Sequence, residues 1–336
     1  EPLLAARQSL VDRFGKLLVV RSSALMEDQA GSTFAGQFES FLGLESEDDF
    51  ITAVRACWAA LWASRARQYM THHHITPADT AMGLLIQPLV EARASGGGMS
   101  LTANNGMLLT ATWGLGSAIA QGEIVPDRYD LDRNGTLRDT VVGRKDHSVH
   151  CVHHQVGPSA QAVAAPRVQE PCLNEKQIKE LSDLLVRAED LLGKPVEIEW
   201  AQDETGFKML QARPLKMEPA QVPDEIWLRH PGIKGHPSGI GWGSGRACVI
   251  NCECELGRLA PGDILVTKVA GPALSQVLPR VSGVVAELGG STSHLASLAR
   301  ERGIPMVLGV PEATRKIPDG AQVGVDGVMG VVRWIN

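Results

Sequence analysis

The stretch Gly289–Gly309, GGSTSHLASLARERGIPMVLG, holds a turn, a helix and the start of a strand, and it decides how the end of the chain folds. Its two leading glycines follow the strand-like run Gly283–Ala286 and allow a tight turn with close approach of a ligand to the backbone. Thr292 or Ser293 can cap the helix that follows, whose apolar residues recur at helical spacing. The pattern therefore places His294 in the first helical turn.

A histidine at a helix start is suited to carry a phosphoryl group. The unpaired N–H groups and the positive end of the helix dipole favour the anion that forms when imidazole is phosphorylated. The same field disfavours ring protonation, and neutral imidazole is the nucleophile that phosphoryl transfer needs. A lone histidine beside a cap is more often structural, but the glycine turn, the hydroxyl run and the strand-turn-helix context reverse that preference. We predict that His294 is catalytic.

The same stretch resembles the phosphohistidine signature of the phosphoenolpyruvate-utilising enzymes, a family that includes phosphoenolpyruvate synthase, pyruvate phosphate dikinase and rifampin phosphotransferase. The segment from Ala260 to Val285 is similar to the strands that lead to the histidine in that family. The resemblance implies that residues 232–336 form a swivelling β/β/α domain, which carries phosphoryl between distant sites.

The earlier part of the chain resembles the nucleotide-binding domain of the same enzymes, which has an ATP-grasp-like fold. The segments that carry this resemblance are Val20–Ser23 (VRSS), Phe34–Ser40 (FAGQFES), Leu84–Val90 (LLIQPLV), Trp113–Gly116 (WGLG), Pro126–Tyr129 (PDRY), Val196–Trp200 (VEIEW) and Gln211–Pro214 (QARP). On this template Arg21, Gly36, Ser40 and Gln87 would contact the nucleotide, and Arg213 its phosphates. Glu199 and Gln211 would also bind there and would hold Mg²⁺, an ion that prefers oxygen ligands.

The residues themselves support part of this assignment. Val20–Ser23 ends a strand with an arginine, whose planar fork suits phosphate, beside two hydroxyls. In Val196–Trp200 the apolar residues alternate with Glu197 and Glu199, which share the opposite strand face. A solvated face is the simpler expectation and suits Glu197, whereas the Gln-x-Arg strand that follows favours a ligand role for Glu199.

Composition shifts predict the domain organisation. Strand-like and helix-like patterns alternate through residues 1–215, residues 216–231 with two prolines suggest a linker, and glycine and valine dominate residues 232–336. We expect an α/β (α+β) protein with an ATP-grasp-like domain followed by the phosphohistidine domain. Relatives carry a Gly-rich, Lys-containing segment upstream of the VRSS strand, so the N-terminal part of the first domain is expected to be missing here.

Composition also limits partners and location. The 336 residues are 44% hydrophobic and 21% charged, with a net charge of −6 and no dense basic block, so we expect no nucleic-acid partner. Apolar stretches are too short for a membrane span and no leader opens the chain, so we expect a cytoplasmic protein. The six cysteines lack a framework spacing, and we expect them to be free thiols.

The predicted function is a dikinase-type phosphotransferase. It would move phosphoryl from ATP through phosphohistidine at His294 to pyruvate or another small hydroxyl or enol compound, giving AMP and phosphate. Two alternatives stay open. The chain is an ATP-binding and phosphohistidine subunit whose acceptor site lies on a second subunit or a missing domain, or it is a non-catalytic nucleotide-binding regulatory module.

A second histidine-rich segment is less specific. His147, His150, Cys151, His153 and His154 are metal-capable side chains on one strand and loop. Structural zinc sites need four converging ligands at defined spacings, which one crowded segment rarely supplies. We leave the role of this cluster open and expect packing or solvent exposure rather than metal binding.

Overall fold

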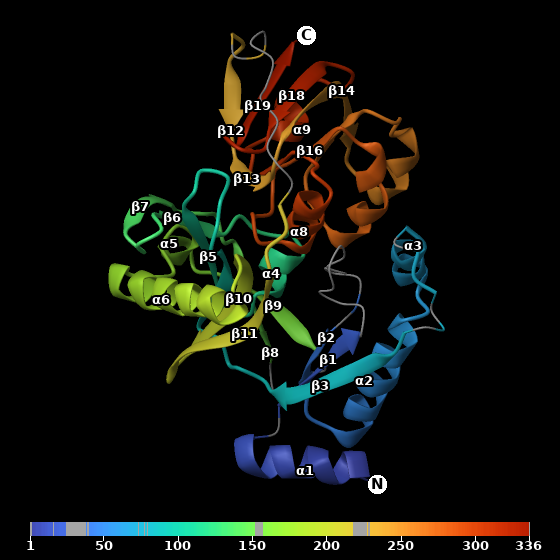
Figure 1. The fold of residues 1–336 in the computed structure, drawn as a ribbon, viewed down its shortest axis with the longest axis vertical. Helices are drawn as coiled ribbons and strands as arrows, with labels where there is room; N and C mark the ends of the chain where they lie inside the picture. The colour runs from blue at the N-terminus through green and yellow to red at the C-terminus, as the bar shows by residue number, and fades with distance from the viewer. Residues whose placement is uncertain are drawn as a thin grey trace.

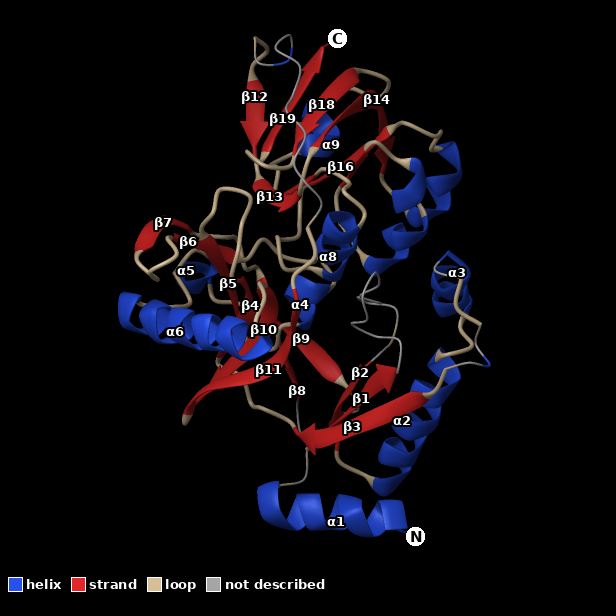
Figure 2. Ribbon diagram, viewed as in Figure 1, coloured by secondary structure: helices blue, strands red, loops and turns tan. Residues whose placement is uncertain are grey.

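The computed structural model describes residues 2–15, 17–24, 38, 40–72, 74–76, 78, 80–151, 157–217, 227 and 229–335. The molecule is elongated, with the N-terminal helix at one end and the C-terminal strand at the other (Figure 1). Within the described residues the strands form sheets of three, six, eight and two strands, and helices lie against them (Figure 2). This mixture confirms the α/β (α+β) class. No helix among these residues has the length and apolar character needed to span a membrane.

The three-stranded antiparallel sheet has the order β2–β1–β3 and packs against α2. Ser46 caps α2, and acidic residues in its first turn complement the helix dipole. The helical spacing of Phe50, Cys57 and Trp58 predicts one apolar face. Phe50 and Cys57 are buried on it, but Trp58 is 50% exposed because it lies at the edge of that face. The elements of this region are α1 (Pro2–Phe14), β1 (Leu18–Ala24), β2 (Ser40–Leu44), α2 (Glu47–Ala60), α3 (Ser64–His72) and β3 (Met82–Pro88).

The six-stranded sheet is antiparallel throughout, with the order β11–β10–β4–β5–β6–β7, and α6 packs across it. Asn174 followed by Gln177 three residues later is the sequence pattern of a capping box, and Gly193 that of a helix end. The structure forms both in α6: Asn174 and Gln177 each bind the other's backbone N–H, and Gly193 ends the helix in the left-handed conformation. The elements are β4 (Ala94–Met99), β5 (Met107–Trp113), α4 (Ser117–Ala120), β6 (Asp127–Leu131), β7 (Leu137–Val141), β8 (His147–Cys151), β9 (Pro158–Ala162), α5 (Ala165–Val168), α6 (Glu175–Leu192), β10 (Val196–Asp203) and β11 (Gly206–Pro214).

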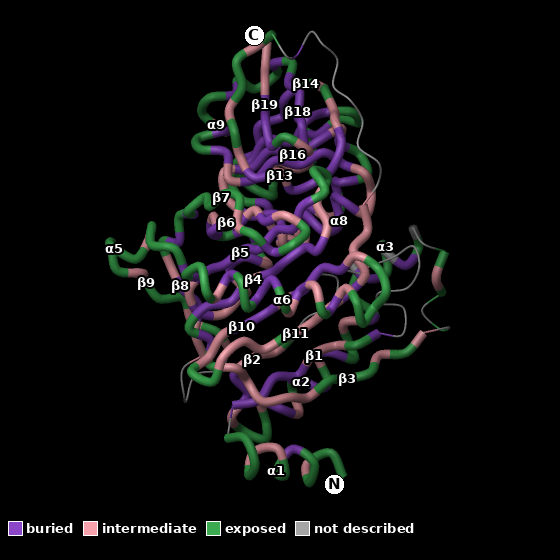
Figure 3. Tube along the Cα trace, turned by 60° about the vertical axis from the view of Figure 1, so that its left-hand side comes forward, coloured by how far each residue is buried: buried purple, intermediate pink, exposed green. Residues whose placement is uncertain are grey.

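The eight-stranded sheet has the order β12–β19–β18–β14–β15–β16–β17–β13, and its run from β14 to β17 is parallel. Its centre and most of α8 are buried (Figure 3). The elements are β12 (Gly232–Lys234), β13 (His236–Gly239), β14 (Trp242–Ile250), η2 (Glu253–Arg258), β15 (Ile264–Thr267), η3 (Pro272–Gln276), η4 (Leu278–Arg280), β16 (Gly283–Ala286), α8 (His294–Glu301), β17 (Met306–Leu308), α9 (Ala313–Lys316), β18 (Gln322–Asp326) and β19 (Val331–Ile335).

Two expectations from the sequence have different outcomes. The division into residues 1–215, a linker at 216–231 and residues 232–336 stays a prediction, because most of the linker lies outside the described residues. The expectation of free thiols is wrong for one pair, since the structure joins Cys252 and Cys254 in a disulfide. Their spacing of two residues across a turn brings the sulfurs together, which a search for widely spaced framework cysteines does not consider. Cys57, Cys151, Cys172 and Cys248 are thiols that take no part in this disulfide.

Candidate active site

His294 is the first residue of α8, as its position after the glycine turn predicts. Gly289 has a φ of +105°, a conformation that favours glycine, so the turn depends on this residue. The sequence left the cap open between Thr292 and Ser293, and the structure assigns it to Ser293, whose Oγ accepts a hydrogen bond of 3.3 Å from the backbone N–H of Ala296. His294 is half-buried and lines a cavity.

This cavity has a volume of about 690 Å³, within the range of small-molecule sites. Its walls come from the three-stranded sheet, the six-stranded sheet, α4 and its flanking residues, the first residue of η3 and the start of α8. With His294, the predicted ligand-binding residues that line it are Arg21, Ser40, Gln87, Glu199, Gln211 and Arg213. Gly36 lies outside the described residues. The structure thus brings together every predicted site residue that it describes, although the individual roles of these residues stay predictions.

Arg21 joins the two sheets across the cavity. Its Nη2 donates a hydrogen bond of 2.9 Å to Gln211 Oε1, and its Nη1 donates one of 3.1 Å to the carbonyl of Leu210. Nη2 also lies 3.7 Å from Glu199 Oε2. Glu199 and Gln211 are paired in the β10–β11 ladder, so their side chains project from neighbouring positions on one face. The guanidinium group of Arg21 thus contacts both predicted metal ligands.

The residues present fit Mg²⁺. A carboxylate and an amide oxygen are ligands this ion accepts, and Mg²⁺ in nucleotide sites usually takes one or two protein oxygens and fills its remaining positions with phosphate oxygens and water. In the part of the chain that the structure describes, no group of three or more His, Cys, Asp or Glu could form an all-protein metal site. Glu199 and Gln211 therefore match a metal held jointly by protein and nucleotide.

The sequence interpretation missed the contribution of β4 to the cavity. Gly96 and Gly97 line it, and neither leaves room for a side chain. A Cβ on Gly96 would lie 1.9 Å from the carbonyl oxygen of Thr110, and a Cβ on Gly97 would lie 2.7 Å from Thr292 Cβ. The sequence contained a signal for this contribution, because three consecutive glycines inside a strand mark a place where a ligand or another part of the chain approaches the backbone closely.

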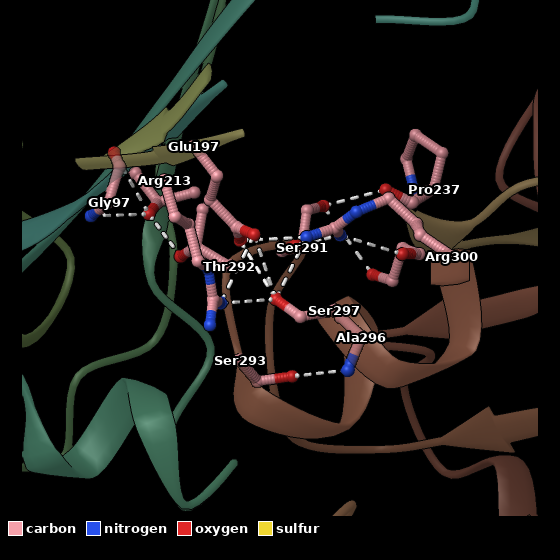
Figure 4. A network of polar contacts seen from close by, with 12 residues as sticks. Gly97, Glu197, Arg213, Pro237, Ser291, Thr292, Ser293, Ala296, Ser297 and Arg300 are labelled. Atoms are coloured by element: carbon pink, nitrogen blue, oxygen red, sulfur yellow. Dashed lines mark hydrogen bonds and ion pairs between the residues drawn. The ribbon is translucent and has the colours of Figure 1, made fainter. Parts of the chain in front are cut away.

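The expectation that Glu197 lies on a solvated face is wrong. Its side chain is only 9% exposed, and the carboxylate binds Arg213, Ser297 and Arg300 (Figure 4). The distances from its oxygens are 3.2 Å to Arg213 Nη2 and 2.7 Å to Arg300 Nη2. β10 has Glu197 and Glu199 on one face, but α8 covers only the first of them. Strand periodicity cannot show which part of a face a distant helix will cover.

The histidine-rich segment forms no metal site among the described residues. His147 lies 3.3 Å from a carboxylate oxygen of Glu123, and His150 Nε2 lies 2.9 Å from the hydroxyl of Ser148. His153 and His154 lie outside the described residues. Local polar contacts account for the two histidines that the structure places.

Two known families match separate parts of the chain. Residues 1–228 match the family described as pyruvate phosphate dikinase, AMP/ATP-binding domain, and residues 259–330 match the PEP-utilising enzyme, mobile domain. The second match includes three residues of the cavity wall, Pro272, Thr292 and His294. The first match includes all the other residues that line the cavity.

Curated relatives match almost the whole chain. Phosphoenolpyruvate synthase of Pyrococcus furiosus is 34% identical over 355 residues, which cover 99% of this chain and 43% of that enzyme. A probable phosphoenolpyruvate synthase of Methanothermobacter thermautotrophicus is 31% identical, covering 98% of this chain and 49% of that protein. Phosphoenolpyruvate synthase of Escherichia coli is 31% identical, covering 94% of this chain and 43% of that enzyme. The chain therefore spans less than half the length of these relatives. A solved structure of Enzyme I (nEIt) is 31% identical over 23% of this chain and 32% of that chain, with a TM-score of 0.21, too low to support a conclusion.

Proposed function

Because the chain belongs to the pyruvate phosphate dikinase family, we propose that it moves phosphoryl from ATP to His294 and then to a small acceptor. In this chain an AMP/ATP-binding domain is followed by a PEP-utilising mobile domain. In the first stage His294, ATP and water yield phosphohistidine, AMP and inorganic phosphate. The imidazole forms a P–N bond to the β-phosphorus as the α–β phosphoanhydride bond breaks and releases AMP, and water cleaves the β–γ bond and releases inorganic phosphate. In the second stage an acceptor oxygen forms a P–O bond as the P–N bond breaks, which restores the imidazole.

The observation that supports this proposal best is that His294 lines the same cavity as the predicted nucleotide ligands. Arg21 lies in β1 and Gln211 in β11, and both face the cavity that the start of α8 closes. In-line displacement requires the nucleophile and the phosphate-binding groups to share one enclosed site. A histidine elsewhere on the surface would not meet this requirement.

Each group has a role that its chemistry suits. Arg21 and Arg213 would bind phosphate oxygens through their planar guanidinium groups, and Gln87 on β3 would hydrogen-bond the adenine edge. The imidazole of His294 would attack phosphorus, with backbone N–H groups at the start of α8 favouring the added negative charge. Glu199 and Gln211 would hold Mg²⁺, which when bound neutralises charge on the phosphates.

The acceptor that we propose is pyruvate, because the curated relatives are named phosphoenolpyruvate synthases. Another small hydroxyl or enol compound would be chemically equivalent at the transfer step. The relatives are more than twice as long as the stretch they share with this chain, so we place the acceptor site on a further segment or on a second subunit.

Labelled ATP tests the proposal. Incubation with Mg²⁺ and [β-³²P]ATP should place acid-labile, alkali-stable label on the protein, and the label should be absent from His294→Ala. His147→Ala is a matched control, because it removes a histidine outside the cavity, and it should label like the parent. Tight ATP binding with no label on any variant would exclude the relay and support the regulatory module instead.

Adding pyruvate to the labelled protein separates the remaining cases. Loss of label with formation of phosphoenolpyruvate indicates that this chain contains the acceptor site. Stable label that is lost only when a second chain is supplied indicates a subunit that depends on a partner.

A further inference from the structure

The helix that carries His294 is attached to the six-stranded sheet by a buried polar cluster, which does not line the cavity except through Arg213. The cluster consists of Glu197 and Arg213 from β10 and β11, and of Ser297 and Arg300 from α8 (Figure 4). All four residues are buried, and with main chain and side chain counted together at most 8% of any of them is exposed. Since the two halves of the cluster are about a hundred residues apart in the chain, it exists only while α8 lies against the sheet.

Glu197 is the centre of the cluster because both sides bind it. Its Oε1 accepts hydrogen bonds of 2.7 Å from Arg300 Nη2 and 2.9 Å from Ser297 Oγ. Its Oε2 accepts a bond of 3.2 Å from Arg213 Nη2, which also donates to Ser297 Oγ at 2.9 Å. Without this carboxylate, Arg213 and Arg300 would lose the buried acceptor that they share.

Glu197 is charged at neutral pH. Burial alone would raise the pKa of its carboxyl group, but the positive charges of Arg300 and Arg213 and the hydrogen bond from Ser297 outweigh burial and hold this pKa below its usual range. The α8 contacts are therefore charge-assisted hydrogen bonds, which are stronger than neutral ones.

A second contact lies on the other side of His294. Thr292 Oγ1 is 2.7 Å from Thr110 Oγ1 on β5, and Thr292 packs directly over Gly97. Ser297 lies one helical turn after His294, so the histidine is held between a contact at Thr292 and a contact at Ser297. Its position in the cavity depends on both.

We propose that Glu197 is a positioning residue that docks α8 on the six-stranded sheet and thereby sets His294 in the cavity. Its carboxylate acts through Ser297 and Arg300 and touches neither the imidazole nor the cavity. The consequence for phosphoryl transfer rests on the proposed function, but the docking itself does not.

The docking of α8 on the six-stranded sheet can be measured without phosphoryl transfer. Thr110 is fully buried and its hydroxyl faces Thr292, so a cysteine introduced by Thr110→Cys should react with iodoacetamide only when α8 leaves the sheet. In a Glu197→Gln background we expect alkylation at this position to be at least about tenfold faster, since loss of one partner in a buried charge pair mainly raises the rate of separation. The fully buried native Cys57, which lies in the three-stranded sheet region, is the internal control for global unfolding and should stay as slow as in the parent.

Two further variants keep the test decisive. Glu189→Gln removes a carboxylate that binds Arg133 at 2.7 Å on the exposed side of α6, and it should leave the alkylation rate at position 110 unchanged. Ser297→Ala keeps all charges and should give a smaller increase than Glu197→Gln. If Glu197→Gln fails to fold, Ser297→Ala decides. The proposal is overturned if neither variant speeds alkylation at position 110, or if Cys57 speeds up equally.

The result is separable from the proposed function. Faster alkylation in Glu197→Gln with no phosphohistidine on the parent would keep the docking role and reject the relay. Normal labelling of the parent with unchanged alkylation would keep the relay and reject the docking role.

Discussion

Arg21 Nη2 donates a hydrogen bond of 2.9 Å to Gln211 Oε1, although the two residues lie in different sheets and are 190 positions apart in the chain. The bond joins the two walls of the cavity and places a guanidinium group next to the predicted Mg²⁺ ligands. One hydrogen bond therefore both holds the two walls of the cavity together and fixes the position of a positive charge inside it.

Replacing Gln211 should weaken the use of MgATP. We expect Gln211→Ala to lower the rate of phosphohistidine formation by at least about tenfold, because it removes a metal ligand and a partner of Arg21. Gln211→Glu keeps an oxygen donor at the same position and should retain more activity, with a stronger response to added Mg²⁺. The check is the labelling rate with [β-³²P]ATP across a Mg²⁺ titration. Equal losses in both variants would argue against a metal role.

A side chain at Gly97 should push the start of α8 away from the sheet. The added Cβ would lie 2.7 Å from Thr292 Cβ, so Thr292 must move and His294 with it. We expect Gly97→Ala to slow phosphohistidine formation by about a hundredfold, since small displacements of a reacting group are costly. Gly257→Ala is the control, because a Cβ there meets nothing within 4 Å. Alkylation at Thr110→Cys should rise in Gly97→Ala, and unchanged alkylation would contradict the steric argument.

Asp127, the acid of the PDRY segment, forms a fully buried ion pair with Lys145. Asp127 also accepts hydrogen bonds of 2.9 Å and 2.7 Å from the backbone N–H groups of Gly143 and Cys172. Lys145→Met leaves a buried carboxylate without its cation and should lower the free energy of unfolding by about 3–5 kcal/mol. Lys179→Met breaks an exposed pair on α6 and should change it little. Urea denaturation of both variants is the measurement, and equal effects would contradict the role of burial.

His236 should make stability depend on pH. Burial, with a smaller effect from the charge of Arg128, lowers the pKa of His236 from 6.5 to about 4. As the pH falls, His236 therefore becomes protonated near pH 6.5 in the unfolded chain but only near pH 4 in the folded chain. The contribution of neutral His236 to the free energy of unfolding is complete above pH 6.5 and is lost as the pH falls from 6.5 to about 4. The free energy of unfolding should therefore decrease by about 2 kcal/mol between pH 7 and pH 5. His236→Gln should lack this loss, and parallel pH profiles for the two proteins would contradict it.

Much of the local structure could be predicted from particular residues. Asn174 and Gln177 form the predicted capping box, and Gly193 ends the helix where expected. These features depend on atoms a few positions apart, so they are readable in the sequence. Trp58 shows the limit, because the helical period places it only at the edge of the apolar face and the packing of neighbours decides its exposure.

The sequence by itself determined that a strand, a glycine turn and a capped helix start at His294, because hydrogen bonds and backbone preferences within a few residues decide such elements. It also predicted residues of a nucleotide site, and those that the structure describes line one cavity. Only the tertiary structure decided that Glu197 docks α8, since its partner Arg300 is 103 positions away. Strand periodicity assigns a residue to a face, but what covers that face depends on how separate sheets and helices pack, and no local interaction carries that information.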